Sequence, residues 1–275
     1  MWFFISTLLY VVYMKSFDPM LDYADNDCEL VDTIPGDVKL INFTAGGGNW
    51  LYQMGIAKFI QEHYDLQNMN VLGTSSGTVA AICLANNINI DFAMNESLVN
   101  AVNEWKKASC FGSVNYLCPI SITAMQNYFS SLTDKSNHNN RLFLTVSQLN
   151  WFGLRKKYLT GGSLNSAAVG CFASAWIPFV TSPFFTPFVT INGRYYVDGY
   201  LSGFRDKVER KNMLVINPNI FKKRPLYKYW VWLDQDYNKR EYREGYSDSF
   251  DNKKKFDFFF NNAFAVMSLD KSSTV

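Results

Sequence analysis

Histidine is scarce in this chain, since its 275 residues include only His63 and His138. In the α/β-hydrolase triad the order along the chain is serine, acid, histidine, so the base must follow the acid. His138 lies in the polar run Ser136–Asn140, which predicts a solvated loop. His63 falls late in a predicted helix, where a surface or last-turn position is expected. The shortage favours a mechanism without histidine, with His138 as the alternative base.

Cysteine is also sparse, and its pattern argues against a metal site. The five residues are odd in number, scattered, and match no zinc-binding spacing. Free, mostly buried thiols in a reducing compartment are the simplest account, and this predicts an intracellular protein. The cysteines are Cys28, Cys83, Cys110, Cys118 and Cys171.

No apolar run reaches the ~20 residues that a membrane-spanning helix needs. The run at residues 1–14 is almost entirely apolar and ends before Lys15. No positively charged segment precedes it and no small-residue cleavage site follows, which disfavours a signal peptide. An interfacial membrane anchor and a segment packed on the protein's own core stay equal alternatives, with a spanning helix third.

Neither sign of charge dominates the chain, since its net charge is only +2. The charged residues are nevertheless unevenly distributed along it. Residues 18–37 carry seven acidic and no basic residues, which predicts a solvated linker. Residues 205–255 carry 14 Lys and Arg against 8 Asp and Glu. This basic region predicts a solvated surface, or alternatively a face that favours anionic lipid headgroups. No nucleic-acid-binding module accompanies the charge, so no nucleic-acid partner is expected.

A candidate nucleophile lies in the sequence Gly73-Thr74-Ser75-Ser76-Gly77. It follows the apolar run 69–72 and precedes the helix-forming run 78–85. Gly-x-Ser-x-Gly between a strand and a helix is the pattern of a nucleophile elbow, in which the glycines allow a sharp turn. Ser75 is therefore the candidate nucleophile, and a plain structural turn is the alternative.

A glycine-rich loop precedes this motif. The predicted strand 38–44 leads into Gly46-Gly47-Gly48, and a predicted helix follows with Leu51, Met54, Phe59 and Ile60 on one face. Bare backbone N–H groups in such a loop can approach a phosphate or an oxyanion. No Gly-Lys-Ser/Thr follows, and Leu51 stands where a dinucleotide fingerprint has its third glycine. The loop is therefore predicted to supply an oxyanion hole together with the N–H of Ser76, and a plain glycine turn is the alternative.

A candidate base lies at Asp198-Gly199, which ends the aromatic and β-branched run 195–197. Asp-Gly is most often only a hairpin turn. If Ser75 pairs directly with an aspartate, Asp198 must be desolvated enough for its pKa to rise towards the range of a general base.

The order of predicted elements indicates a three-layer α/β/α fold with a mainly parallel central sheet. Helical spacing at 92–105 and 163–172 alternates with a buried strand at 142–146. A composition that is 48% hydrophobic and 17% aromatic supplies a large core, and part of the aromatics is available for a lipid-facing rim. We predict an N-terminal segment with its acidic linker at 1–35, a catalytic domain at 36–220, and a basic, aromatic C-terminal extension at 221–275.

Taken in this order, the glycine loop, the Gly-x-Ser-x-Gly motif and the later Asp-Gly resemble the patatin-like phospholipase family. The connecting segments 173–178 and 191–199 are also similar, so the resemblance covers roughly residues 40–200. It implies Ser75 as nucleophile, Asp198 as base of a Ser-Asp dyad, and Gly46, Gly47 and Gly48 as the oxyanion hole. Three departures concern the oxyanion loop and the activity level: Asn49-Trp50 in place of a basic residue after the glycines, Tyr200 after Asp-Gly, and the absence of Asn-x-Pro from 201–205.

These observations predict a lipid acyl hydrolase, of phospholipase A or lysophospholipase type, that works through an acyl-enzyme. No metal and no organic cofactor are expected, because every step is proton transfer or charge stabilisation. The expected partners are a lipid substrate and a membrane surface, with the aromatic segment 176–188 lining an acyl groove or packing in the core. The alternatives are a catalytically silent lipid-binding protein on the same fold and a membrane-tethered interaction protein.

Overall fold

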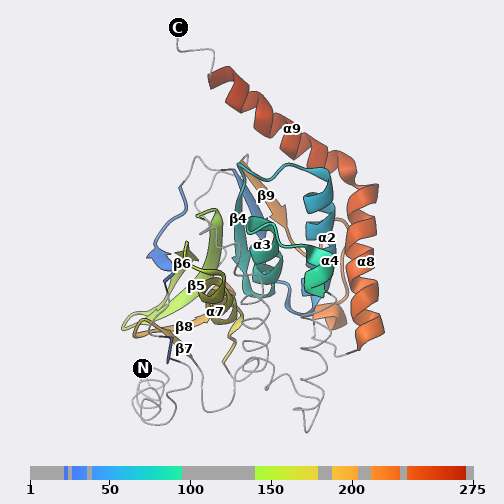
Figure 1. Cartoon of the computed structure of the whole chain (residues 1–275). Coiled ribbons are helices and arrows are strands. Elements are labelled where there is room, and N and C mark those ends of the chain that lie inside the picture. Colours follow the sequence, from blue (N-terminus) through green and yellow to red (C-terminus); the bar gives the residue numbers. More distant parts are fainter. Residues whose placement is uncertain are drawn as a thin grey trace.

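One mixed β-sheet organises the described part of the chain (Figure 1). The computed structural model describes residues 22–23, 27–35, 39–94, 140–178, 188–203, 212–229 and 234–270, with the side chains of 22–23 and 262–270 excepted. The strand order is β1-β7-β8-β5-β4-β3-β9, and β6 pairs with both β5 and β2. The strands are β1 Asp22–Tyr23, β2 Glu29–Val31, β3 Leu40–Phe43, β4 Asn70–Thr74, β5 Leu142–Asn150, β6 Gly153–Thr160, β7 Val189–Ile191, β8 Arg194–Asp198 and β9 Met213–Ile216.

The centre of the sheet is parallel. Strand β3 pairs in parallel with β4 and β9, and β4 pairs in parallel with β5. Strand β3 is buried along its whole length, as expected for a strand that is covered on both faces. Antiparallel β6 pairs with the edge of β5 opposite β4, and antiparallel β8, which also pairs with β7, follows β4 along the same edge. The predicted α/β fold class with a mainly parallel central sheet flanked by helices is confirmed.

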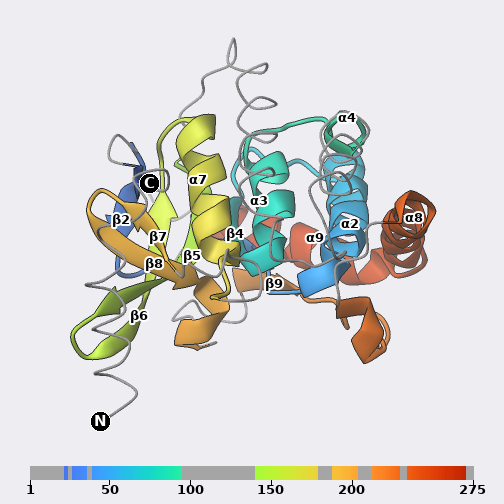
Figure 2. The ribbon, with the colours of Figure 1, turned by 90° about the horizontal axis from the view of Figure 1, so that it is seen from below.

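Three helices lie side by side on one face of this sheet, as Figure 2 shows. They are α2 Trp50–His63, α3 Thr78–Ala85 and α7 Leu164–Ala175. Helices α2 and α3 are the crossover connections of the parallel strands β3, β4 and β5, and they match the predicted helices after the glycine loop and after Ser75. The other helical segments are η2 Gly47–Asn49, η3 Ser75–Gly77, α4 Ile90–Phe92, η7 Gly199–Ser202, η9 Leu226–Tyr229, α8 Gln235–Asp251 and α9 Lys253–Asp270. Most of the predicted helix 92–105 lies outside the described residues.

The acidic N-terminal stretch contributes strands rather than serving as an unpaired linker. Strand β2 pairs with β6 and β1 pairs with β7. Ile34, an apolar residue of the same N-terminal stretch, belongs to a small core cluster on the opposite face of the sheet from α2. The other members of this cluster are Leu40, Leu72, Phe143 and Tyr158. The described acidic side chains of the stretch, those of Asp27, Glu29 and Asp32, are exposed, and Asp32 pairs with Lys157. The acidic residues alone predicted a linker because they hid the few apolar positions that anchor the segment.

Helix α8 packs directly against α2, and one glycine in each helix allows the two backbones to lie close together. A Cβ at Gly55 of α2 would lie 2.0 Å from the Tyr242 carbonyl oxygen, and one at Gly245 of α8 would lie 2.0 Å from the Tyr52 carbonyl oxygen. The start of α9 continues the contact, since Phe256 and Phe260 are buried in the main core. The predicted extension at 221–275 thus begins with helices that complete the core.

Tyrosine–carboxylate hydrogen bonds tie this helical layer together. Hydroxyl groups donate from Tyr52 to Asp248 (2.7 Å), from Tyr64 to Asp257 (2.8 Å), from Tyr242 to Asp91 (2.8 Å) and from Tyr246 to Glu62 (2.7 Å). Each ring fills apolar space while its hydroxyl reaches the polar rim, which is the usual arrangement for a buried tyrosine. Part of the high aromatic content is therefore structural.

The cysteines and the apolar N-terminus can be placed only in part. Cys28, Cys83 and Cys171 are free and buried, as predicted, whereas Cys110 and Cys118 lie outside the described residues. Among the helices that the structure describes, none is both long enough and apolar enough to cross a membrane. Residues 1–14 are outside the described ranges, so the anchor stays a prediction.

Candidate active site

Ser75 lies at a strained turn between β4 and α3. Its φ is +54°, a left-handed value that serine seldom adopts and that costs on the order of 1–3 kcal/mol. Two hydrogen bonds hold the turn: the Ser75 N–H donates to Ser174 Oγ (2.8 Å), and Thr78 Oγ1 donates to the Ser75 carbonyl (2.6 Å). The side chain is buried, with 7% of its surface exposed. This is the geometry of a nucleophile elbow.

The two glycines of the motif are required by close packing. A Cβ at Gly73 would lie 2.6 Å from Thr78 Cα, and one at Gly77 would lie 2.5 Å from the Phe43 carbonyl oxygen. The first contact lets α3 start directly against β4, and the second lets the elbow approach the end of β3. Gly73 and Gly77 therefore have the structural role that the motif predicts.

Strand β5 brings Ser75 and Asp198 together. Its first half pairs in parallel with β4 as far as Thr74 opposite Thr145, and the next residue, Val146, pairs with Asp198 at the end of antiparallel β8. Strand β6 occupies the other edge of β5 along both halves, so β4 and β8 run towards each other along one edge. They end at adjacent positions, and this register places the two predicted residues at one junction, although 123 residues separate them in the sequence.

Asp198 is almost completely buried, with 1% of its surface exposed. Burial raises the pKa of its carboxyl from 3.8 to about 6, against smaller opposite effects of the Ser75 hydroxyl and the Tyr200 N–H. Oδ1 accepts the Tyr200 N–H at 2.7 Å, whereas Oδ2 has no hydrogen bond of ordinary geometry from any described residue. One buried carboxylate oxygen is thus held in place and the other is left for a proton. The Ser75 hydroxyl is close enough to this carboxylate to oppose the rise of its pKa.

The turn after Asp198 is fixed by residues of β5. A Cβ at Gly199 would lie 2.2 Å from the Thr145 carbonyl oxygen, so the Asp-Gly pair owes its glycine to close backbone approach. Ser147 Oγ donates to the Asp198 carbonyl (2.7 Å) and accepts the Ser202 N–H (3.0 Å). The motif here begins the short helix η7 rather than a hairpin, and the β7–β8 hairpin is instead turned by Asn192-Gly193.

The glycine loop lies beside the elbow, with one change to its predicted role. The Gly46 N–H donates to Ser76 Oγ at 3.0 Å, so this N–H anchors the loop and is not open to an oxyanion. Gly47 and Gly48 begin η2, where the first N–H groups of a helix lack intrahelical partners, and Gly47 has a φ of +52°. The N–H groups of Gly47 and Gly48 in η2, and of Ser76 in η3, occupy such first-turn positions. The correction arises because a side-chain hydroxyl reaches back across the junction, which the glycine pattern does not reveal.

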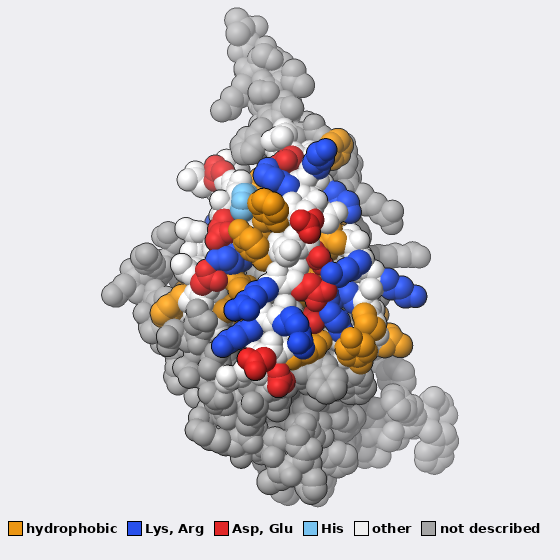
Figure 3. All heavy atoms as spheres, turned by 90° about the vertical axis from the view of Figure 1, so that its right-hand side faces the viewer, with side chains coloured by type: hydrophobic (Ala, Val, Ile, Leu, Met, Phe, Trp, Pro, Cys, Tyr) orange, Lys and Arg blue, Asp and Glu red, His pale blue; other side chains and the backbone are white. Residues whose placement is uncertain are grey.

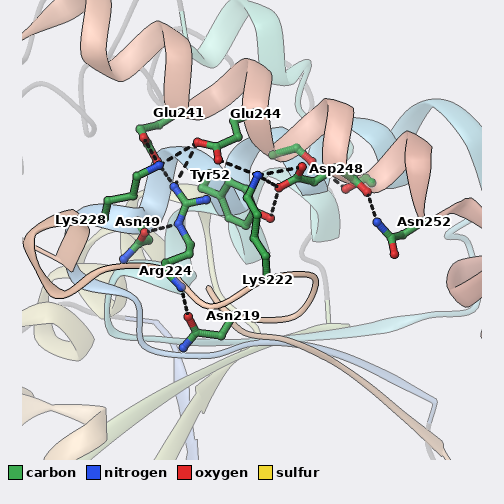
Figure 4. Close-up of polar contacts among 12 residues, drawn as sticks. Asn49, Tyr52, Asn219, Lys222, Arg224, Lys228, Glu241, Glu244, Asp248 and Asn252 are labelled. Carbon is green, nitrogen blue, oxygen red and sulfur yellow. Dashed lines mark hydrogen bonds and ion pairs between the residues drawn. The ribbon is translucent and has the colours of Figure 1, made fainter.

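A buried polar network supports the glycine loop from behind (Figure 4). Asn49 holds the Gly46 carbonyl through both its backbone N–H (3.0 Å) and its side-chain amide (3.0 Å). The Asn49 side-chain oxygen accepts from Arg224 Nε at 2.7 Å. Arg224 is 3% exposed, pairs with Glu241 of α8, and stacks on the Tyr52 ring with 3.8 Å between the guanidinium carbon and the ring centroid. Sequence reasoning missed Arg224, because 175 positions separate it from Asn49 and it lies in a stretch counted as basic surface.

Lysine and acidic side chains surround this network and neutralise one another. Lys222 and Lys228 both pair with Glu244, at 2.8 and 2.9 Å. Burial alone would raise the pKa of Glu244, but hydrogen bonds from these two lysines lower it to about 2. Figure 3 shows Lys and Arg intermixed with Asp and Glu on the face that carries α8. The described part of the basic region therefore presents mixed charge rather than a uniformly positive surface.

The remaining sequence candidates lie away from the junction or outside the described residues. His63 ends α2, where its Nδ1 is 2.9 Å from the Phe59 carbonyl and its ring stacks on Phe59, as expected for a last-turn residue. His138 is not described. Trp176 is fully buried, and its carbonyl accepts the Asp198 N–H at 2.8 Å, so it belongs to the core. Most of the segment predicted for the acyl groove, 179–187, lies outside the described ranges, and Phe188 is half-buried with its ring centroid 6.0 Å from that of Tyr195. Within those ranges, no three His, Cys, Asp or Glu residues are grouped to hold a metal ion.

Comparison with known proteins gives distant structural likeness alone. No family model and no curated protein matches the sequence. Seven chains of solved structures match the fold. One is VipD from Legionella pneumophila, with 12% identity and a TM-score of 0.39; the match covers 75% of this chain and 55% of the VipD chain. The chain thus spans about half the length of that neighbour, and the functional conclusion rests on the geometry of the site.

Proposed function

We propose that this protein hydrolyses carboxylic esters with Ser75 as nucleophile and Asp198 as general base. The observation that carries the proposal is the strand register, which ends β4 and β8 at adjacent positions along β5. The strained φ of Ser75 and the raised pKa of buried Asp198 support it independently, because active sites concentrate both features.

In the first half-reaction, Ser75 Oγ attacks the ester carbonyl carbon and its proton passes to Asp198 Oδ2. The carbonyl oxygen becomes an oxyanion, which the N–H groups of Gly47, Gly48 and Ser76 stabilise. When the tetrahedral intermediate collapses, the bond to the alcohol breaks and the alcohol oxygen takes the proton from Asp198. An acyl group remains on Ser75.

In the second half-reaction, Asp198 accepts a proton from water as the water oxygen attacks the acyl carbon. Collapse breaks the bond to Ser75 Oγ, which recovers the proton from Asp198, and the fatty acid is released. The balance needs only ester and water. A pKa of about 6 suits both roles, since the carboxyl is mostly ionised at neutral pH and still accepts a proton readily.

Lipid acyl esters, cleaved in a phospholipase A or lysophospholipase manner, are the substrate class that we favour. The ordered motifs resemble those of the patatin-like phospholipases over roughly residues 40–200. In addition, Tyr200 and Leu201 immediately after Asp198 are 45% and 44% exposed, which puts apolar surface beside the dyad. An acyl chain is the part of a lipid that such surface would accept.

The test is ester turnover by the full chain with p-nitrophenyl esters of increasing acyl length and with a phospholipid. We expect turnover that rises with chain length, and losses of ~10⁴-fold or more in both Ser75→Ala and Asp198→Asn. Asp236→Asn, an exposed aspartate on α8, serves as the matched control and should retain full activity. Turnover that survives Ser75→Ala would remove the proposed nucleophile. A folded wild type that binds lipid without turnover would establish the silent lipid-binding alternative.

A further inference from the structure

The turn of the β5–β6 hairpin carries two adjacent aromatic side chains in solvent. Asn150 pairs with Gly153, so Trp151 and Phe152 form the turn between the strands. Trp151 is 81% exposed and Phe152 is 97% exposed, and Leu154 beside them is 40% exposed. Single exposed apolar residues are common, but adjacent large ones at a projecting turn mark an interaction site.

Neither the turn nor the core accounts for these aromatics. The left-handed backbone conformation of the turn falls on Gly153, with a φ of +120°, and the Phe152 N–H donates to Asn150 Oδ1 at 2.8 Å. Glycine and asparagine therefore supply the turn chemistry, and polar residues would serve equally well at 151 and 152. The fold therefore gives no reason for large apolar side chains at positions 151 and 152.

Positive charge lies close to the turn. The hairpin sequence 142–160 contains Arg155, Lys156 and Lys157 and no acidic residue. Lys157 is paired with Asp32 from β2, while Arg155 is exposed on the same strand. Arg194 starts β8, whose Tyr196 pairs with Gln148, so Arg194 is also exposed level with the end of β5. Aromatic side chains at the turn, with basic side chains on the strands next to it, are complementary to a layer that is apolar inside and anionic at its boundary.

The turn also lies in the direction in which β4 ends, which is the end that carries Ser75. Strand β5 continues beyond the end of β4, and Trp151 is six residues past Thr145, so the turn extends about 20 Å past the Ser75–Asp198 junction. The hairpin can be followed at the left of Figure 1 and the lower left of Figure 2, on the side of the sheet away from α2 and α8.

We propose that the turn of the β5–β6 hairpin docks the protein on an anionic lipid bilayer. Trp151 and Phe152 enter the interface between headgroups and acyl chains, where tryptophan is favoured, and the exposed Arg155 and Arg194 contact the anionic headgroups. This docking goes beyond ester hydrolysis and does not depend on it. In the described part of the 205–255 stretch, Lys222, Arg224 and Lys228 are instead paired with acidic residues of α8.

The test is co-sedimentation of the full chain with vesicles of phosphatidylcholine, with and without phosphatidylserine, at low and high salt. Wild type and Ser75→Ala should bind the anionic vesicles equally well, and salt should weaken the binding. The double substitution Trp151→Ser with Phe152→Ser should lower the affinity roughly tenfold or more. Leu226→Ser, which alters an apolar side chain that is 84% exposed on η9, should change nothing.

Arg155→Gln with Arg194→Gln should reduce binding to anionic vesicles while leaving binding to phosphatidylcholine unchanged. All these positions are exposed, so a thermal unfolding midpoint equal to that of wild type will show that each variant is folded. Wild-type affinity in the aromatic variant, or no vesicle binding by wild type, would overturn the proposal. A change of oligomeric state in the aromatic variant without lipid would do so too, because the turn would then be a protein interface.

Discussion

At the scale of single residues, the candidate site combines a strained backbone with a destabilised charge. Ser75 keeps a left-handed φ because hydrogen bonds to its N–H and its carbonyl fix the turn from both sides. Asp198 keeps one carboxylate oxygen without an ordinary hydrogen-bond partner among the described residues, and burial disfavours its ionised form. Both features cost stability, which is typical of residues selected for chemistry rather than for folding.

The raised pKa predicts the pH dependence of hydrolysis. Asp198 must be ionised to accept the Ser75 proton, so kcat/KM should be constant at neutral pH. Below about pH 6 it should fall roughly tenfold per pH unit. The measurement is kcat/KM for a neutral ester between pH 4.5 and 8, which spans about 1.5 pH units below the pKa of Asp198 and about 2 above it. A profile that stays flat down to pH 5 would mean that another group is the base.

The same shift predicts that Asp198→Asn stabilises the fold at neutral pH. Since the folded pKa exceeds the ordinary value of 3.8, the folded state binds more protons between about pH 4 and 6, and wild-type stability falls as pH rises through this window. Asparagine removes the buried charge and retains an oxygen for the Tyr200 N–H. We expect a gain of about 1–3 kcal/mol in the free energy of unfolding at pH 7.5, shrinking towards zero below about pH 4. Urea denaturation at both pH values measures it, and a loss at pH 7.5 contradicts the account.

At the scale of elements, the decisive arrangement is the pairing of one long strand with two others on the same edge. The sequence predicts Ser75 and Asp198 as individual motifs because each has a local pattern of glycines and strand residues. Their adjacency depends on β5 exceeding β4 in length, and the sequence predicted only residues 142–146 of that strand. The resemblance to a known motif order supplied the pairing that periodicity alone could not.

The polar network behind the glycine loop gives a prediction for Arg224 and Glu241. Replacing Arg224 by Met removes the guanidinium from buried Glu241, which then keeps only its ion pair with Lys228. We therefore expect a loss towards the lower end of the roughly 3–5 kcal/mol that breaking a buried ion pair costs. The double variant Arg224→Met with Glu241→Met should lose far less, because no unpaired charge remains. The free energies of unfolding of the single and double variants, measured by chemical denaturation, form a double-mutant cycle. Additive losses in this cycle would contradict the account. Turnover should be low in the single and in the double variant, because Asn49 lacks the hydrogen bond from Arg224 in each of them.

At the scale of the whole molecule, the C-terminal helix closes the core that the sheet and α2 leave open. Composition predicted a separate basic extension, because residues 222–255 are rich in lysine and arginine. What sequence reasoning lacked was the tertiary partner: Gly55 and Gly245 are 190 positions apart, and neither looks special without the other helix.

The close crossing predicts that Gly245→Ala destabilises the whole fold. Its Cβ would lie 2.0 Å from the Tyr52 carbonyl oxygen, and two packed helix backbones cannot both shift without loosening the Tyr52–Asp248 contact. We expect a loss of about 1–3 kcal/mol, the usual cost of overpacking. Lys239→Ala, on the exposed face of the same helix, should change stability by less than about 0.5 kcal/mol. Thermal unfolding of both variants decides the matter, and equal midpoints would show that α8 is loosely attached.

The most direct measurement for the central claim is covalent labelling by a fluorophosphonate, followed by peptide mapping. The account predicts one adduct, on Ser75, formed at a rate that rises with pH through about 6, as ionised Asp198 becomes available. Asp198→Asn should slow the labelling severely, and Ser75→Ala should abolish it. An adduct on another residue, or labelling that persists in Ser75→Ala, would contradict the assignment of the nucleophile.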